Sequence, residues 1–389
     1  MHRLFFPEEI WLEDRAAEQR MTQQILNRLP EVPVRRIENI GGELARRNAL
    51  PQKRVLVLAR QDGRFLKPCP GTRNYVCCGY YFLNLATNCD INCSYCILQG
   101  YLNNPYMTVY TNLGDLFTEL ETVLRAHRSH FYRIGTGELT DSLTIDHLTH
   151  YSEVLIPFFL RQPNAILDLK TKTVQIQNLL QFEPKGKVIV SWSLNPDELI
   201  AREEPNAPCL QDRLEAARVC AERGYLIGFH FDPLIHYPGW EEGYREAVRE
   251  IFRHVPSRQI VWISLGALRY PAEMDRIVRE RHPESRIVLG EMFPGKDGKL
   301  RYFRPIREKM FRRMVQWIRE SGKDVRIYLC MESPEVWRAA FGKQPLAECG
   351  LPRQLDTSVF TCQGLLLDST EPGQNSPRGR ALPHHFESS

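Results

Sequence analysis

Six short apolar runs alternate with helical stretches along this chain, and this alternation constrains its fold more than any other feature. The runs occupy residues 81–86, 131–136, 165–171, 188–194, 225–231 and 260–265. Near-continuous apolar runs are typical of strands that are buried on both faces of a parallel sheet. Between them, residues 111–127 and 209–224 have the apolar spacing of amphipathic helices. The pattern predicts an α/β fold built from parallel βα units, either as an open doubly wound sheet or as a closed or partial barrel.

The rest of the chain is predicted to form additions to this α/β body at residues 80–285. An N-terminal extension over residues 1–79 has a helix pattern at 13–29 and a strand pattern at 54–59. Residues 286–345 carry a hairpin signal at Asp297 and Gly298, followed by a helix at 305–322 and a strand at 325–331. Residues 346–389 are predicted to be a mostly disordered tail, because 368–389 are rich in Pro, Gly and Ser.

The composition favours a globular protein of the cytoplasm. Hydrophobic residues make up 43% of the chain and charged residues 25%, which excludes disorder of the whole. The first residues lack a long apolar run, so we expect neither a signal peptide nor a membrane anchor. In the cytoplasm the 11 cysteines should stay reduced, and clustered thiols then indicate metal ligands or reactive groups. The net charge is only +4, so a polyanionic partner must meet a local basic face.

Three cysteines follow the first predicted strand, where the loops of a parallel sheet carry chemistry. Cys89, Cys93 and Cys96 are separated by three residues and then by two. Thiolates suit iron-sulfur clusters and zinc, and both usually take four protein ligands. Three thiols can hold a cubane cluster whose fourth iron stays open, or three members of a zinc site, or they can be unrelated buried side chains. A fourth zinc ligand would come from the upstream cysteines Cys69, Cys77 and Cys78.

The cysteine spacing, with Tyr95 before the last cysteine, resembles the signature of the radical S-adenosylmethionine superfamily. From about residue 80 to 310, "CSYCILQGYLNNP", "IDHLTH" (145–150) and "GWEEGYR" (239–245) resemble the spore photoproduct lyase family. The resemblance implies a partial (β/α)6 barrel and a 4Fe-4S cluster held by the three cysteines. It also implies S-adenosyl-L-methionine as cofactor, an electron donor such as a flavodoxin or ferredoxin, and repair of a methylene-bridged thymine dimer in DNA.

Several site residues are carried over from this resemblance. Lys172, Ser193 and Asn195 match positions around the bound S-adenosylmethionine, and Tyr95 is the tyrosine retained from the hydrogen-transfer region. Glu138, in "GTGE", resembles the acidic residue of the GGE motif, whose carboxylate serves the ammonium of the cofactor.

The chain departs from the lyase pattern where hydrogen returns to the substrate. Counted back from Ile145, Glu138 stands where the lyase has its donor cysteine, and Ile97 replaces a relay tyrosine. Cys78, beside Cys77, is a candidate replacement donor. The departure leaves open a radical reaction on a different nucleic acid or on another substrate. A zinc-stabilised nucleic-acid-binding protein without catalysis is the alternative from another class.

Two further groups of side chains have both a functional and a structural interpretation. His230 and Asp232 alternate onto one side of the fifth strand, where the lyase pattern is apolar, and suit either acid-base chemistry or a structural hydrogen bond. The hairpin around Asp297 combines cations with aromatic rings, which indicates a nucleic-acid contact or an ordinary solvated surface. Its residues are Lys296, Lys299, Arg301, Tyr302, Phe303 and Arg304.

Overall fold

The computed structural model describes residues 4–46, 53–71, 75–342 and 350–364, and its largest element is an eight-stranded sheet curled into a half-barrel. Six consecutive members of the sheet are parallel, and they match the six apolar runs. These strands are β5 (Tyr81–Leu83), β8 (Tyr132–Gly135), β9 (Ala165–Thr171), β10 (Val188–Ser193), β11 (Leu226–Leu234) and β12 (Ile260–Ala267). The predicted partial barrel is therefore confirmed.

The two edges of this sheet are additions to the six-stranded body. Strand β4 (Leu66–Pro68) pairs antiparallel with β5 at one edge. Strand β16 (Ile327–Leu329) pairs parallel with β12 at the other, so the last predicted strand extends the main sheet.

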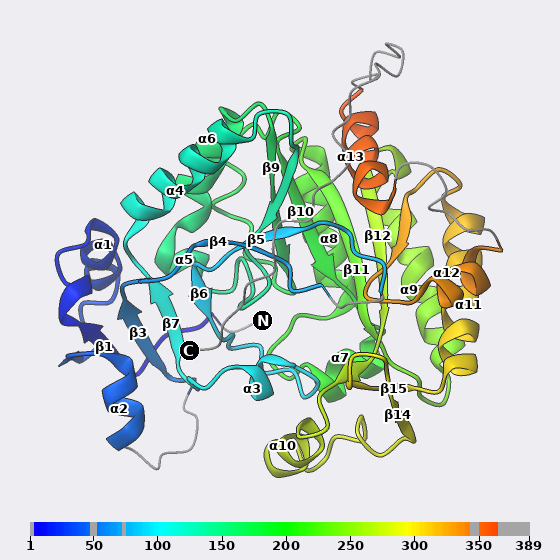
Figure 1. The fold of residues 1–389 in the computed structure, drawn as a ribbon, viewed down its shortest axis with the longest axis horizontal. Helices are drawn as coiled ribbons and strands as arrows, with labels where there is room; N and C mark the ends of the chain where they lie inside the picture. The colour runs from blue at the N-terminus through cyan, green and yellow to red at the C-terminus, as the bar shows by residue number, and fades with distance from the viewer. Residues whose placement is uncertain (1–3, 47–52, 72–74, 343–349, 365–389) are drawn as a thin grey trace.

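Helices cover the outer side of the curl, as Figure 1 shows. The crossover helices are α4 (Leu113–Ala126), α6 (Tyr151–Leu160), α8 (Leu210–Glu222), α9 (Trp240–His254) and α11 (Arg304–Ser321). Helices α6 and α8 contact the central strands, and this interface buries the apolar faces of both layers. Shorter helical segments complete the body: α3 (Leu98–Tyr101), α5 (Asp146–Thr149), α7 (Asp197–Glu203), η2 (Ser257–Gln259) and α10 (Met274–Arg281). No helix in the described ranges is long and apolar enough to cross a membrane.

A second, five-stranded sheet lies beside the half-barrel, on the left of Figure 1. Its strands are β1 (Glu9–Glu13), β2 (Val34–Ile37), β3 (Val55–Ala59), β6 (Ala86–Thr87) and β7 (Met107–Tyr110). The helix expected at 13–29 is shorter than predicted, because its first residues end β1 and form the turn η1 (Asp14–Ala16) before α1 (Arg20–Arg28). Helix α2 (Ile40–Arg46) completes this part.

The first apolar run corresponds to two strands and not one. Residues 81–83 form β5 in the main sheet, and residues 86 and 87 form β6 in the second sheet. Between them, the Leu85 carbonyl accepts hydrogen bonds from the Tyr110 amide and the Tyr151 hydroxyl. The chain thus passes from one sheet to the other immediately before the cysteine loop.

The C-terminal part contains the predicted hairpin and helix, together with an unexpected helix. Strands β14 (Met292–Pro294) and β15 (Leu300–Tyr302) pair antiparallel around the Asp297–Gly298 turn, and β13 (Arg269–Tyr270) joins them. After β16 come α12 (Pro334–Phe341) and α13 (Gly350–Cys362). Helix α13 packs on β12 and buries Leu351, Leu355 and Val359, which corrects the expectation of disorder for this segment. Residues 365–389, the Pro-, Gly- and Ser-rich stretch, lie outside the described residues, and our division into four segments stays a prediction.

Candidate active site

A cavity of about 490 Å³ opens at the carboxyl ends of the main strands. Loops that follow β6, β8 and β9 line it, together with the carboxyl ends of β10 and β11 and with Leu268 after β12 (Ile260–Ala267). This edge is where parallel α/β proteins place their chemistry. The cavity brings together eight of the predicted site residues: Cys89, Cys93, Tyr95, Cys96, Glu138, Lys172, Ser193 and Lys299.

The cysteine loop is held in a defined shape by its asparagines. Asn88 and Asn92 adopt left-handed backbone conformations, with φ of 68° and 58°, which Asn tolerates better than most residues. The Asn88 side-chain amide donates to the carbonyls of Asn104 and Tyr106, both at 2.7 Å. The loop therefore presents its three thiols to the cavity from a fixed backbone.

The three thiols line one cavity, and the described residues form no ready site for a single metal ion around them. All three are free of disulfides, and burial raises the pKa of Cys93 to about 12, so binding of a metal must displace its proton. Among the described residues, no group of three or more Cys, His, Asp or Glu side chains is arranged to hold a metal ion. A cluster does not need such convergence, because each cysteine binds its own iron. A zinc site that combines the loop with upstream cysteines is therefore not formed by the described residues.

The loop that carries Glu138 is set against the neighbouring strand. A Cβ atom at Gly137 would lie 2.8 Å from the Lys170 carbonyl oxygen, so only glycine allows this approach. Buried Asp141 then accepts hydrogen bonds from the Thr171 hydroxyl and the Lys172 amide, both at 2.7 Å. Asp141 thus fastens the Glu138 loop to the end of β9, where Lys172 begins its turn. Sequence reasoning missed Asp141, because its partners lie 30 residues away along the chain.

A buried carboxylate, Glu204, organises the other side of the cavity. It accepts hydrogen bonds from four side chains: Tyr95, Lys172 at 3.3 Å, Asn195 at 2.9 Å and Arg213 at 2.5 Å. Burial by itself raises the pKa of Glu204, but the Arg213 and Lys172 cations outweigh that effect and hold the pKa well below its ordinary value. Glu204 is therefore a permanent anion at neutral pH. It follows α7 and carries no motif, so the sequence offered no signal for it.

The Glu204 cluster changes the roles of two predicted residues. Both ends of the Asn195 amide are occupied, since its nitrogen donates to Glu204 and its oxygen accepts from the Tyr244 hydroxyl at 2.8 Å. Asn195 is buried and positions Glu204, and its direct contact with the cofactor stays a prediction. Tyr95 lines the cavity with its hydroxyl turned to Glu204, and the Lys172 ammonium lies 5.5 Å from its ring centroid. Its catalytic role stays a prediction.

The opposite end of the cavity is charged. Arg269 binds Asp232 through two hydrogen bonds of 2.8 and 3.1 Å, and Lys170 lines the wall beside them. His230 is buried and its Nε2 atom has no partner in the described structure. Burial and the nearby Lys170 lower the pKa of His230, so the ring is neutral. The hydrogen bond expected between His230 and Asp232 is not formed, because Arg269 takes the carboxylate.

The thiol that reaches the cavity from upstream is Cys69 and not Cys78. Cys69 follows β4 and lines the cavity wall. Cys78 is absent from that wall, and its carbonyl accepts a hydrogen bond from the Arg133 guanidinium. Cys78 therefore does not occupy the expected position on the cavity wall, and its catalytic role stays a prediction. Its neighbour Cys77 is exposed, and a hydrogen bond from the Cys78 thiol lowers its pKa to about 6.

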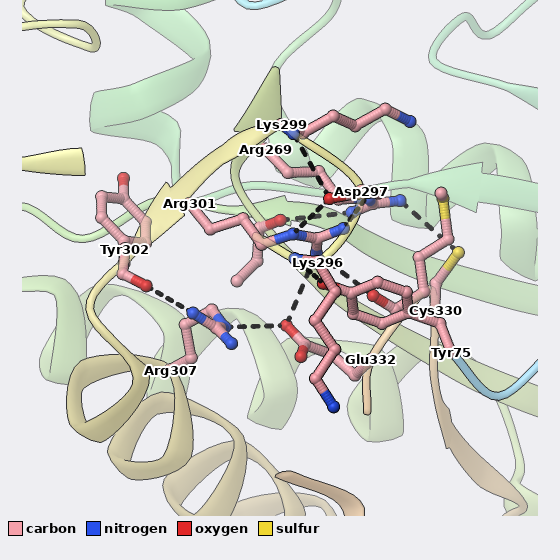
Figure 2. Close-up of polar contacts among 12 residues, drawn as sticks. Tyr75, Arg269, Lys296, Asp297, Lys299, Arg301, Tyr302, Arg307, Cys330 and Glu332 are labelled. Atoms are coloured by element: carbon pink, nitrogen blue, oxygen red, sulfur yellow. Dashed lines mark hydrogen bonds and ion pairs between the residues drawn. The ribbon is translucent and has the colours of Figure 1, made fainter. Parts of the chain in front are cut away.

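Side chains of the hairpin form polar contacts within the protein that the sequence did not indicate, as Figure 2 shows. The Arg301 side chain is paired with Asp297 at 2.6 Å, donates to the Met331 carbonyl and stacks 4.6 Å from the Tyr75 ring centroid. Arg301 is only 1% exposed and Tyr302 only 6%, so neither offers surface to a nucleic acid. Their predicted nucleic-acid contact is corrected, because the hairpin folds back on its own acidic turn.

The remaining hairpin cations stay candidates for a nucleic-acid contact. Lys299 lines the cavity, and its ammonium lies 5.8 Å from the Tyr101 ring centroid. Arg304 is exposed and pairs with Glu308 at 2.6 Å. An exposed pair of this kind is weak, so Arg304 can exchange its partner for a phosphate.

A half-barrel of parallel strands that presents three free cysteines on the loop after its first strands defines the radical S-adenosylmethionine class. The chain belongs to the spore photoproduct lyase family, since the family model "Spore photoproduct lyase" matches residues 5–321.

Curated relatives and solved structures agree with this assignment. A spore photoproduct lyase of a Geobacillus species is 28% identical over 301 residues, which cover 74% of this chain and 86% of the relative. The Bacillus subtilis spore photoproduct lyase is 26% identical over 303 residues, with coverage of 75% and 86%. A solved spore photoproduct lyase complexed with dinucleoside spore photoproduct has a TM-score of 0.75 at 24% identity, covering 84% of this chain and all of that one. A mutant with bound AdoMet and dinucleoside spore photoproduct gives the same values. The likeness to these structures concerns the fold.

Proposed function

We propose that this protein is a radical S-adenosylmethionine lyase that repairs a methylene-bridged thymine dimer, the spore photoproduct, in DNA. The observation that supports the proposal is the shared cavity, which is lined by the three cysteines and by Glu138, Lys172 and Ser193. Family membership supports the same chemistry, and so do the curated relatives named as spore photoproduct lyases. The neighbour structure with AdoMet and a dinucleoside spore photoproduct supports a cofactor and a lesion as the two occupants.

Five residues of the cavity wall have a part in this proposal. Cys89, Cys93 and Cys96 hold the 4Fe-4S cluster, which together with S-adenosylmethionine supplies a 5'-deoxyadenosyl radical when both are bound. The Glu138 carboxylate suits the ammonium of the cofactor, and the Lys172 ammonium suits its carboxylate. Glu204 keeps Lys172 in place through the 3.3 Å ion pair, so the cationic end of the cavity is preorganised.

The proposed partners are DNA and a one-electron donor such as a flavodoxin or ferredoxin. Lys299 and Arg304 are the hairpin residues proposed to meet the phosphate backbone, since Lys299 faces the cavity and Arg304 faces solvent. Contacts of this kind position a nucleic acid without reading its sequence.

A second candidate is a radical reaction on a different nucleic acid or another substrate. It is favoured by Glu138, which stands where the lyase pattern has a donor cysteine, and by the ionic end of the cavity. Lys170, Asp232 and Arg269 line that end, and charged side chains suit a more polar substrate than a thymine dimer.

Anaerobic reconstitution of the cluster tests both candidates. The full chain is incubated with dithionite, S-adenosylmethionine and a dinucleoside spore photoproduct, and 5'-deoxyadenosine and thymidine are measured together. Formation of both supports the lyase. Cofactor cleavage without thymidine rejects the lyase and favours the second candidate. Absence of both products, in protein that contains the reduced cluster, contradicts the radical mechanism.

A further inference from the structure

Cys69 is a thiol of the cavity that has no place in the chemistry described so far. Among the described residues, it is the one cysteine outside the cluster loop that lines the cavity. It shares this wall with Glu138, the residue that stands where the lyase pattern has its donor cysteine. Glu138, which has no thiol at the donor position, and Cys69, which has one, therefore line the same cavity.

The backbone holds Cys69 in this position. Its amide donates to the Tyr80 carbonyl at 2.8 Å, and its carbonyl accepts from the Gly71 amide at 2.6 Å. The first bond continues the pairing of β4 with β5, so the segment is fastened to the edge of the half-barrel. The cysteine therefore approaches the cavity from a strand end, a more precise support than a long loop.

The other nearby thiols do not reach the cavity. Cys77 is exposed, and neither it nor Cys78 lines the cavity wall. Cys330 lies behind Arg269, whose guanidinium donates to its sulfur at 3.5 Å, and it does not line the wall either. Position alone thus separates Cys69 from its neighbours.

Cys69 also carries its hydrogen at neutral pH. Burial raises the pKa of Cys69 to about 12, and the nearby Glu138 carboxylate adds to this effect. A thiol of this kind is a poor nucleophile, because nucleophilic attack requires the thiolate. It keeps the S–H bond that donation of a hydrogen atom requires.

We propose that Cys69 returns the hydrogen atom to the substrate in this chain, in place of the donor cysteine that Glu138 replaces. The inference rests on the proposed lyase function. After the bridge of the dimer breaks, the S–H bond of Cys69 breaks and a C–H bond forms on the thymine methylene carbon. The unpaired electron passes from that carbon to the Cys69 sulfur. One electron from the one-electron reductant and one proton from solvent then restore the thiol.

Repair in D2O tests this role directly. The S–H of Cys69 exchanges with solvent, so the methyl group of the repaired thymine should contain deuterium in the wild type. In Cys69→Ala, thymidine yield and its deuterium content should each fall about tenfold or more, while 5'-deoxyadenosine formation stays within about twofold. Cys209→Ala, which changes an exposed thiol that does not line the cavity, is the matched control and should repair as the wild type does.

The possible outcomes are distinct. Wild-type repair together with full, deuterated repair by Cys69→Ala overturns the role of Cys69 and leaves the lyase function intact. Loss of repair in Cys78→Ala instead of Cys69→Ala transfers the role to Cys78 and also overturns the inference. A wild type that forms 5'-deoxyadenosine but no thymidine refutes the proposed function, and the inference falls with it. Cys69→Ser, which keeps the size of the side chain, replaces the alanine variant if that variant loses its cluster colour.

A second readout does not depend on turnover. Iodoacetamide labelling of Cys69, followed by mass spectrometry at a pH that allows slow reaction, should slow when dinucleoside spore photoproduct is added without cofactor. Labelling of Cys209 should not change. Equal labelling of Cys69 with and without the lesion means that the thiol does not meet the substrate, which contradicts the proposal.

Discussion

Replacement of Glu204 by glutamine should destabilise the protein more than any exposed charge change of the same type. The side chains of Glu204 and Arg213 are both 0% exposed, and their ion pair is 2.5 Å long. Glu204→Gln leaves the Arg213 cation buried without its counter-charge. The amide group also places a donor opposite either Arg213 or the donors of Lys172, Asn195 and Tyr95, whichever way it turns.

The magnitude follows from the burial of this pair. Removing one partner of a buried ion pair costs about 3–5 kcal/mol, because the remaining charge keeps its desolvation penalty. With a urea dependence of about 3 kcal/mol per molar, the unfolding midpoint should fall by about 1 M or more. The assay is urea unfolding of wild type and variant, prepared identically and followed by circular dichroism.

Glu215→Gln is the matched control for this measurement. Glu215 also accepts two hydrogen bonds from an arginine, Arg218, but its side chain is 50% exposed. The free energy of unfolding should therefore remain nearly unchanged in this variant. If both variants lose the same small amount of stability, burial of the Glu204 pair does not have the energetic role that we assign to it.

Three further predictions concern acid stability, the Glu138 loop and the cluster. The folded pKa of Glu204 lies below its unfolded value of about 4.3, so its contribution to stability is complete above that value. The contribution is lost as pH falls toward the folded pKa, by up to about 1.4 kcal/mol per pH unit. Urea titrations from about pH 5.5 to 3.5 should therefore show a shallower pH dependence of stability in Glu204→Gln than in the wild type, and identical slopes would contradict the assignment. Gly137→Ala places a Cβ atom 2.8 Å from the Lys170 carbonyl, so S-adenosylmethionine affinity measured by calorimetry should fall about tenfold, whereas Gly114→Ala, with open space around it, should leave affinity intact. Cys93→Ala should abolish cofactor cleavage and lower iron content, and retained 5'-deoxyadenosine formation would exclude Cys93 as a ligand.

The main sheet could be predicted from the sequence because parallel strands that are buried on both faces have continuous apolar sequences. Strands β9 and β10 coincide almost residue for residue with the runs at 165–171 and 188–194. The passage from β5 to β6 could not be predicted in this way. One uninterrupted apolar run serves both strands, and the change of sheet depends on hydrogen bonds to Tyr110 and Tyr151 far along the chain.

The candidate site divides along the same line. Cys89, Cys93 and Cys96 could be found because their chemistry depends on local spacing. Glu204 and Asp141 could not, because neither belongs to a motif and the folded chain alone shows which side chains surround them. In the hairpin, the sequence predicted a surface contact for residues that are buried. A cation next to an aromatic residue in the sequence can lie either on the surface or in a buried network. Only the folded chain shows that Asp297 and Tyr75 enclose Arg301.

Residues 81–87 contribute a strand to each of the two sheets, and this joint limits how the chain can be recombined. In this chain β3 pairs with β7. A chimaera that takes its first 80 residues from a relative would have to pair the β3 strand of the relative with the β7 strand of this chain. Exchange of the whole stretch through β7 (Met107–Tyr110) would preserve that interface but would replace the cysteine loop as well. The N-terminal sheet and the thiols next to it are thus expected to be inherited as one unit.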